Sequence, residues 1–230
     1  MTVARSVDVT RSIPVIASCD VCVVGGGSAG IAASVASARA GAKTILVERY
    51  GFLGGASTAG MVGPFMTSWS ADGSEPIIAG VFRELVDKMI ALGGAIDPAT
   101  TEPGDKWTGY IALGHANATP FSVEACKLAA LQLVGDAEAA KTQPITDAPT
   151  VYDIPYRILV PQKLDNLLVA GRPVSATHEA AASVRIIPPC YAMGQAAGLA
   201  AALAARGNVA PMDLDIDLLR RELAAQSAIV

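Results

Sequence analysis

The chain has 230 residues, of which 52% are hydrophobic and 17% charged, and its formal net charge at pH 7 is −4. This length allows one or two domains and leaves enough chain to bury a large core. The acidic balance and the lack of any run of Lys and Arg argue against a nucleic-acid partner. We therefore expect an α/β protein that binds a small-molecule substrate.

The first 20 residues carry scattered charges and no apolar stretch of signal-peptide length, so we expect a cytoplasmic protein. Residues 186–205 approach the length of a membrane span. Their two prolines, glutamine and glycines favour a buried helix instead. We expect no membrane association.

Two cysteines, Cys19 and Cys22, form a CxxC motif at the start of the first predicted strand. Side chains three positions apart in a strand point to opposite faces, so these two are poorly placed to chelate a metal or to pair. We interpret them as small buried hydrophobic residues and expect no metal site.

The stretch "DVCVVGGGSAGIAASVASARAG" predicts a strand at 21–24, a tight glycine turn and a helix closed by Gly41. In a G-x-G-x-x-G turn the first glycine makes the turn, the second lets the backbone approach a pyrophosphate, and the third lets the helix pack on its strand. The N–H groups of the helix N-terminus would then face the phosphates. The residues of this turn are Gly25, Gly27, Ser28, Ala29 and Gly30.

The run "KTILVE" predicts a second strand that ends at Glu48, 23 residues after Gly25. This is the spacing expected for a carboxylate that accepts hydrogen bonds from ribose hydroxyls. An acidic residue here disfavours a 2′-phosphate. The pattern favours ADP, NAD or FAD over NADP.

A second glycine-rich turn, "RYGFLGGASTAGMV", follows directly. It resembles the glutathione-reductase-like flavoproteins, and among them the family of FAD-dependent oxidoreductases. The resemblance implies FAD as the cofactor and a Rossmann-like parallel sheet with flanking helices, in a reduced FAD-binding domain of the glutathione-reductase type. It places Arg49 near the adenosine, and four residues beside the pyrophosphate and flavin: Gly54, Gly55, Ala56 and Ser57.

Residues 152–204 resemble the closing segment of the same family, with a strand in "NLLVAGR" and a helix in "CYAMGQAAGLAAALAARG" that Gly207 ends. The resemblance implies that Gly171 and Arg172 contact the cofactor. It also implies that the helix, beginning near Met193, points its positive end at the flavin, with Gly194 and Gln195 at the pyrimidine edge.

The chain departs from the family between these two parts, because the usual β-rich substrate domain and its returning strand are missing. We expect one FAD-binding domain, with a βαβ unit at 1–64, a helical and loop insertion at 65–150 and the closing segment at 151–230. With one strand lost, the strand at 166–170 would pair directly with 21–24. Apolar surface left uncovered by the deletion predicts a homodimer or another homo-oligomer.

The insertion and the tail contain three further predicted helices. One lies within 75–94, one of about 15 residues begins near 121, and a surface helix capped by aspartates lies within 211–226. Residues 97–120 read as a loop or cover and 141–150 as a linker. The loop and the helix within 75–94 are our candidates for the oligomer interface.

Candidates for catalysis are few. His178 follows the closing strand and could act as an acid, base or hydrogen-bond donor beside the flavin, or be a structural histidine. His115 reads as a solvated loop residue. Glu179 and Arg185 could pair with each other, and Tyr156 and Arg157 could line the flavin or belong to the core.

Three functions are open at this point. The first is an FAD-dependent oxidoreductase whose flavin accepts hydride. The second is an enzyme like the thiazole synthases, which hold an adenylated intermediate in the same cradle. The third is a flavin or nucleotide carrier without chemistry, such as a subunit completed by a partner.

Overall fold

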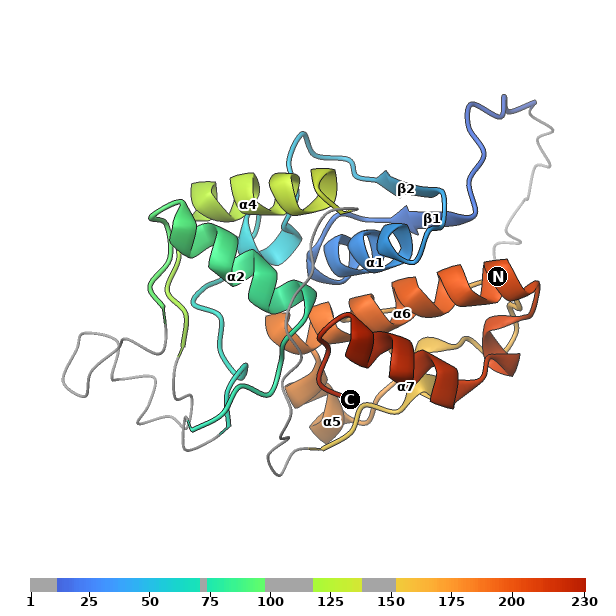
Figure 1. Ribbon diagram of the computed structural model, residues 1–230. Coiled ribbons are helices and arrows are strands. Elements are labelled where there is room, and N and C mark those ends of the chain that lie inside the picture. Colours follow the sequence, from blue (N-terminus) through green and yellow to red (C-terminus); the bar gives the residue numbers. More distant parts are fainter. Residues whose placement is uncertain (1–11, 71–73, 98–117, 138–151) are drawn as a thin grey trace, which may run out of the picture.

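The computed structural model describes residues 12–70, 74–97, 118–137 and 152–230. It opens with the predicted βαβ unit: strand β1 (Val21–Val24), helix α1 (Ser28–Arg39) and strand β2 (Thr44–Val47). The strands are parallel, with Val21 opposite Thr44 and Val24 opposite Val47. Both lie on one side of α1 (Figure 1). The sequence prediction for this unit is confirmed.

Helix α1 is covered on every side. Its seven consecutive residues from 31 to 37 are all buried, which a helix with one solvent face cannot achieve. The hydroxyl of Ser37 donates to the carbonyl of Ala33 at 2.8 Å, and that of Ser34 donates to Ile31 at 2.9 Å. The helix therefore carries buried serines without unpaired hydroxyl groups.

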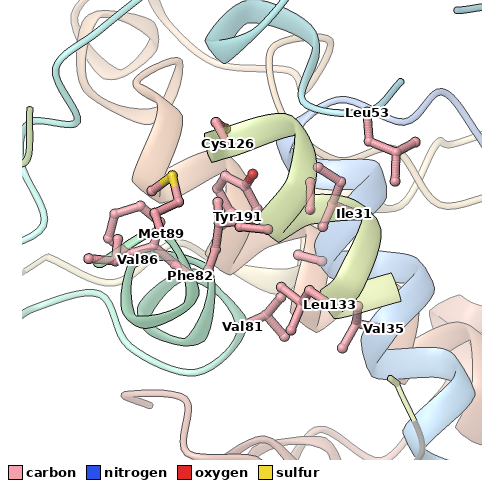
Figure 2. Close-up of a cluster of buried hydrophobic side chains, with 14 of the residues drawn as sticks. Ile31, Val35, Leu53, Val81, Phe82, Val86, Met89, Cys126, Leu133 and Tyr191 are labelled. Carbon is pink, nitrogen blue, oxygen red and sulfur yellow. The ribbon is translucent and has the colours of Figure 1, made fainter. Parts of the chain in front are cut away.

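The two helices expected in the insertion are α2 (Val81–Ala91) and α4 (Val123–Gly135). They pack against each other and against α1, and α2 also packs against α6 (Ile187–Gly207), as Figure 1 shows. Figure 2 shows the apolar cluster that they enclose, in which Phe82, Met89, Leu133 and Tyr191 are at most 3% exposed. Burial also raises the pKa of the Cys126 thiol in this cluster to about 12.

The C-terminal part holds a short helix α5 (His178–Val184), the long helix α6 and the final helix α7 (Ile216–Ala225). A 3-10 turn at Tyr156–Leu159 precedes α5, and another at Pro211–Asp213 lies between α6 and α7. The capping prediction for α7 is confirmed, because Asp215 accepts from the N–H groups of Asp217 and Leu218. Helix α5 was not predicted. Its seven residues are too few for a helical period to stand out in the sequence.

Helix α6 begins earlier than predicted, and it ends at Gly207 as predicted. It begins at Ile187 rather than near Met193, because Pro188 and Pro189 fit a first helical turn, where their missing N–H groups have no intrahelical partner to lose. The left-handed residue that caps its C-terminus is Asn208, with a φ of 49°, and not Gly207. Asn is the other residue that adopts this conformation readily.

Helices α1 and α6 approach each other backbone to backbone. A Cβ on Gly198 would lie 2.1 Å from the carbonyl oxygen of Ala33, and one on Gly194 would lie 2.1 Å from that of Ala29. The two glycines and the two alanines are each four residues apart, so they form matching rows on facing helices. Small residues here let the two helices pack at close range.

The sheet is smaller than predicted. Within the described residues it has the two strands β1 and β2 only, and residues 167–170 are extended but join no sheet. The expected pairing of 166–170 with β1 is therefore wrong. A cavity of about 480 Å³ lies between these segments, so the two edges stand too far apart to share hydrogen bonds.

In the part of the chain that the structure describes, no single helix is long and apolar enough to cross a membrane. Helices α5 and α6 reach that length and apolarity only as a pair, and they are bent by 88° at the break between them. Most of α6 is buried against other helices, as predicted.

Candidate functional site

The first glycine turn connects β1 to α1 through contacts that leave no room for side chains. Gly25 has a φ of 101° and donates its N–H to the carbonyl of Val47 at 2.8 Å. A Cβ on Gly30 would lie 1.7 Å from the carbonyl oxygen of Gly25. Gly25 thus makes the turn and Gly30 permits the close packing of helix on strand, the two roles expected from the pattern.

The N-terminus of α1 opens beside this turn. Its N-cap is Gly27, no side chain caps it, and no acidic residue lies in its first turn. A Cβ on Gly27 would have only the Cα of Gly55 near it, at 4.0 Å, while Ser28 and Ala29 are partly exposed. Uncapped N–H groups and the positive end of the helix dipole make this position suited to a phosphate group.

Glu48 follows β2 and is fixed by three backbone N–H groups. Its Oε2 accepts from Gly26 at 2.6 Å, and its Oε1 accepts from Arg49 at 2.7 Å and Tyr50 at 2.9 Å. The bonds from Tyr50 and Gly26 are the main cause that lowers the pKa of this carboxyl below its usual 4.5. A carboxylate oxygen has two lone pairs, so Oε2 keeps room to accept a further hydrogen bond.

Gly26 is a residue that the sequence pattern overlooked. Its N–H holds Glu48, and a Cβ on it would lie 2.5 Å from Cδ2 of Leu53. The G-x-G-x-x-G pattern treats this position as free. The run of three consecutive glycines was the available signal.

The second glycine turn folds back on the first. The N–H of Gly54 donates to the carbonyl of Gly26 at 2.8 Å, and a Cβ on Gly55 would lie 2.9 Å from the Cα of Gly27. Gly54 and Gly55 both have positive φ, at 111° and 53°. The two turns are thus one unit whose shape depends on backbone contacts.

The 3-10 turn Gly55–Ser57 follows and carries the next two predicted residues. Ala56 is half-buried, whereas Ser57 is fully buried and its Oγ has no hydrogen-bond partner. Arg49 is exposed, and its guanidinium donates to the hydroxyl of Tyr50 at 2.6 Å. The second glycine turn therefore lies against the first, and the exposed Arg49 follows Glu48 in the chain.

The closing segment reaches the same end of α1. Gly171 has a φ of 81° and is buried, and a Cβ on it would lie 3.1 Å from the Cβ of Ala29. Arg172 follows it and is exposed. These two predicted residues therefore lie near the first glycine turn, although residues 167–170 form no strand.

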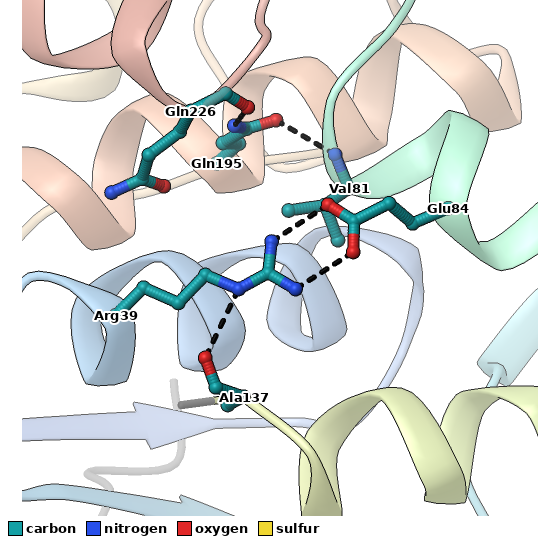
Figure 3. Close-up of polar contacts among 6 residues, drawn as sticks. All are labelled: Arg39, Val81, Glu84, Ala137, Gln195 and Gln226. Atoms are coloured by element: carbon teal, nitrogen blue, oxygen red, sulfur yellow. Dashed lines mark hydrogen bonds and ion pairs between the residues drawn. The ribbon is translucent and has the colours of Figure 1, made fainter. Parts of the chain in front are cut away.

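Gly194 and Gln195 are neighbours on α6 with different contacts. Gly194 packs against the backbone of Ala29. Gln195 is 2% exposed, and its amide accepts from the N–H of Val81 at 3.1 Å and donates to the carbonyl of Gln226 at 3.2 Å (Figure 3). Gly194 therefore lies beside the first glycine turn, and the Gln195 side chain joins α6 to the start of α2 and to the end of α7.

The start of α6 is also a weak donor of hydrogen bonds. Pro188 and Pro189 have no N–H, and the N–H of Cys190 is bonded to the carbonyl of Ile186. Of the four N–H groups that a helix start normally offers, that of Ile187 remains. The positive end of the helix dipole remains, but most of the free N–H donors that usually accompany it are lacking.

Among the described catalytic candidates, His178 and Glu179 begin α5 and Arg185 follows its last residue. His178 is exposed at the first position of α5, and His115 lies outside the described residues. The ion pairs found among the described residues do not join Glu179 to Arg185.

The candidates Tyr156 and Arg157 stand in the 3-10 turn Tyr156–Leu159. The hydroxyl of Tyr156 donates to the carbonyl of Pro211 at 2.9 Å, and burial raises its pKa to about 12. Tyr156 therefore ties the closing segment to the C-terminal helices.

The cysteines divide between two environments. Cys126 and Cys190 are buried, whereas Cys19 is half-buried and Cys22 is exposed. The interpretation of Cys22 as a buried residue was wrong, because no strand covers the outer edge of β1. Among the described residues, no group of three or more His, Cys, Asp or Glu side chains could hold a metal ion.

Comparison with known proteins identifies the chain's family. The model of the family described as FAD dependent oxidoreductase matches residues 20–148 and 137–223, so the matched part includes both glycine turns, Glu48 and the closing segment. No curated protein and no solved structure matches the chain. The chain belongs to the FAD-dependent oxidoreductase family, whose cofactor is FAD.

Proposed function

We propose that the chain is a flavoprotein oxidoreductase of the glutathione-reductase-like type that binds FAD without a covalent bond. The observation that carries the proposal is the joint position of Glu48 and the first glycine turn, which are linked by the 2.6 Å bond between Gly26 and the carboxylate. This hydrogen bond fixes the carboxylate that would accept from the ribose next to the glycine turn that would bind the phosphates.

The described residues fit the adenosine and pyrophosphate half of FAD. The Glu48 carboxylate would accept from the ribose hydroxyls, and the uncapped N–H groups at the start of α1 would bind the pyrophosphate. Gly27 and Gly55 would let the cofactor approach, because side chains at these positions would fill the space between the two turns. The buried and unpaired Oγ of Ser57 is a further polar atom beside this space.

When bound, FAD supplies the capacity to accept a hydride or electrons. The chain's own contribution would be position and charge. Arg172 would add positive charge at the closing side, and the N-terminal end of α6 would favour an anionic ring. His178 is the candidate for moving a proton at its imidazole, because it is exposed in the segment that follows Gly171.

A second candidate function is a flavin-binding subunit that a partner completes. It is favoured by one observation, the unpaired outer edge of β1 and the cavity beside it. In this case the chain would hold the cofactor and another polypeptide would supply the substrate contacts. We expect a cytoplasmic protein that acts as a homodimer or another homo-oligomer in either case.

The experiment is to identify the ligand that the purified protein releases on denaturation. We expect FAD by absorbance and mass spectrometry, and restored flavin absorbance when the apoprotein is mixed with FAD. An adenine-containing ligand without flavin would favour the thiazole-synthase-like alternative. Bound FAD without turnover with any electron acceptor would favour the subunit.

A further inference from the structure

The cavity beside β1 has the shape of an empty strand position. It is lined on one side by the five consecutive residues 20–24 and on the other by the six consecutive residues 165–170. Consecutive side chains of an extended segment point to alternate faces. All residues of one wall can therefore face the cavity only with their backbone edge. Small residues of α1 and α6 form the floor, among them Gly30, Ala33, Gly198 and Ala201.

This cavity borders the FAD site proposed above at Ala29 and Gly30 but extends away from it along β1. Its lining includes neither Glu48 nor the second glycine turn. Its volume of about 480 Å³ is that of a small-ligand pocket, but its walls are two strand-like edges. The inference below therefore does not rest on the proposed function.

No segment among the residues that the structure describes pairs with the outer edge of β1, so this edge offers main-chain groups for pairing. Val21 and Gly25 donate their N–H groups toward the β2 side, and alternate residues of a strand direct these groups to the same edge. Cys22 and Val24 therefore direct theirs to the cavity, and the side chain of Val24 is 82% exposed. Such an edge is a ready template for another strand.

The segment that precedes β1 is a suitable occupant. Residues 12–18, which we name the arm, contain no helix or strand, and its apolar residues Ile13, Val15 and Ile16 are 79%, 89% and 95% exposed. Seven extended residues span roughly 23 Å, whereas the four of β1 span roughly 13 Å. The arm is long enough to cover the edge.

The arm cannot readily reach the edge of its own β1. Asp20 is fixed on the β2 side, because its N–H donates to the carbonyl of Lys43 at 2.9 Å and its carboxylate accepts from the N–H of Lys43 at 2.8 Å. Ser18 and Cys19 would have to form the whole reversal. Two-residue hairpin turns require positive φ and favour Gly, Asn and Asp, which these two residues are not.

We propose that the arm of a second copy of this chain occupies the cavity and pairs with β1, and that two copies exchange arms around a two-fold axis. The exchange covers apolar side chains of each arm and pairs both open edges. The assembly is complete with two copies, because each copy has one arm and one cavity. The arm replaces α2 as the predicted interface, since the apolar face of α2 is already buried within the chain.

Light scattering on the full chain at low micromolar concentration tests the exchange. The variant Ile13→Asp/Val15→Asp/Ile16→Asp should be monomeric, with a dimer dissociation constant raised roughly 100-fold or more. The matched control Met61→Asp/Leu128→Asp/Leu131→Asp changes three other exposed apolar side chains and should remain a dimer like the parent. A monomeric parent, or an arm variant that dimerises equally well, would overturn the proposal.

Cross-linking distinguishes a second copy from the chain's own arm. In a Cys19→Ser background, Ile16→Cys should form a covalent dimer with Cys22 under mild oxidation, as the oxidant takes two electrons and two protons from the two thiols. Leu131→Cys in the same background should not, and adding Cys22→Ser should abolish the dimer. A disulfide within one chain, or no cross-link at all, would contradict the exchange.

Discussion

The two sides of α1 differ in how much of their structure the chain itself supplies. At the N-terminus of the helix, the two glycine turns, Glu48 and Gly171 contact one another at backbone distance. Along the outer edge of β1, an open cavity separates the strand from residues 165–170. The first side is complete and the second lacks a strand.

The difference follows from the sequence separation of the contacts. The complete side joins β1, α1, β2 and the second turn within residues 21–57, so its contacts are local. On the open side, no described segment pairs with the outer edge of β1, and the wall across the cavity, residues 165–170, lies far along the chain. The local unit forms from neighbouring residues, whereas this edge depends on residues distant in sequence.

The largest expected effect tests the buried ion pair that joins the C-terminal end of α1 to α2. Arg39 and Glu84 form a bidentate ion pair at 2.7 Å, with side chains 9% and 7% exposed, and Arg39 also donates to the carbonyl of Ala137 (Figure 3). Glu84→Ala leaves a buried guanidinium unpaired and should lower the free energy of unfolding by about 3–5 kcal/mol.

Chemical denaturation measures this loss. On the same helix, Asp87 forms an exposed ion pair with Arg83, and Asp87→Ala should cost no more than about 0.5 kcal/mol. Equal losses for the two variants would mean that the buried pair does not brace α1 and α2.

The next effect concerns the helix contact that both sides share. Gly198→Ala brings a Cβ against the backbone of Ala33 and should lower the free energy of unfolding by about 2–4 kcal/mol, because backbone cannot move aside as a side chain can. Thermal unfolding reports the change. Gly207→Ala in the same helix meets only a Val209 side chain at 3.7 Å and should be neutral or slightly stabilising. A neutral Gly198→Ala would show that α1 and α6 are less closely packed.

A smaller effect sharpens the role of Glu48. Glu48→Ala removes a charged acceptor and should weaken FAD binding by about 1.5–3 kcal/mol, roughly 10- to 100-fold in dissociation constant. Flavin fluorescence during titration of the apoprotein measures it, with Glu222→Ala as the surface control. Unchanged affinity for Glu48→Ala would show that this carboxylate does not bind the ribose.

The smallest effect is the response of the complete side to acid. Backbone hydrogen bonds lower the pKa of Glu48 in the folded state, so the carboxylate contributes stability above pH 4.5 that is lost as the pH falls through the lowered pKa. Glu48→Gln lacks this contribution. Denaturant midpoints at pH 6 and pH 3.5 should differ slightly less in the variant than in the parent, and an equal difference would contradict the assignment.

The sequence predicted the complete side well because its signals are local. Glycine spacing, the acidic residue after β2 and the aspartates before α7 each specify geometry within a few residues or one βαβ unit. The predicted start of α6 was wrong because it followed the family resemblance, whereas Pro188 and Pro189 belong to the first turn of the helix. The unpaired edge of β1 and the buried bonds of Gln195 depend on residues more than 30 positions away, which no local pattern encodes.

Calorimetric titrations of the apoprotein with FAD and, separately, with ADP compare the two sides directly. The complete side would contact the part of FAD that ADP also contains, whereas Gln195, expected at the ring, is 2% exposed and is bonded to Val81 and Gln226. We predict that ADP binds and supplies most of the binding free energy of FAD. Strong binding of FAD with no detectable binding of ADP would contradict the account, because it would move the main contacts to the open side.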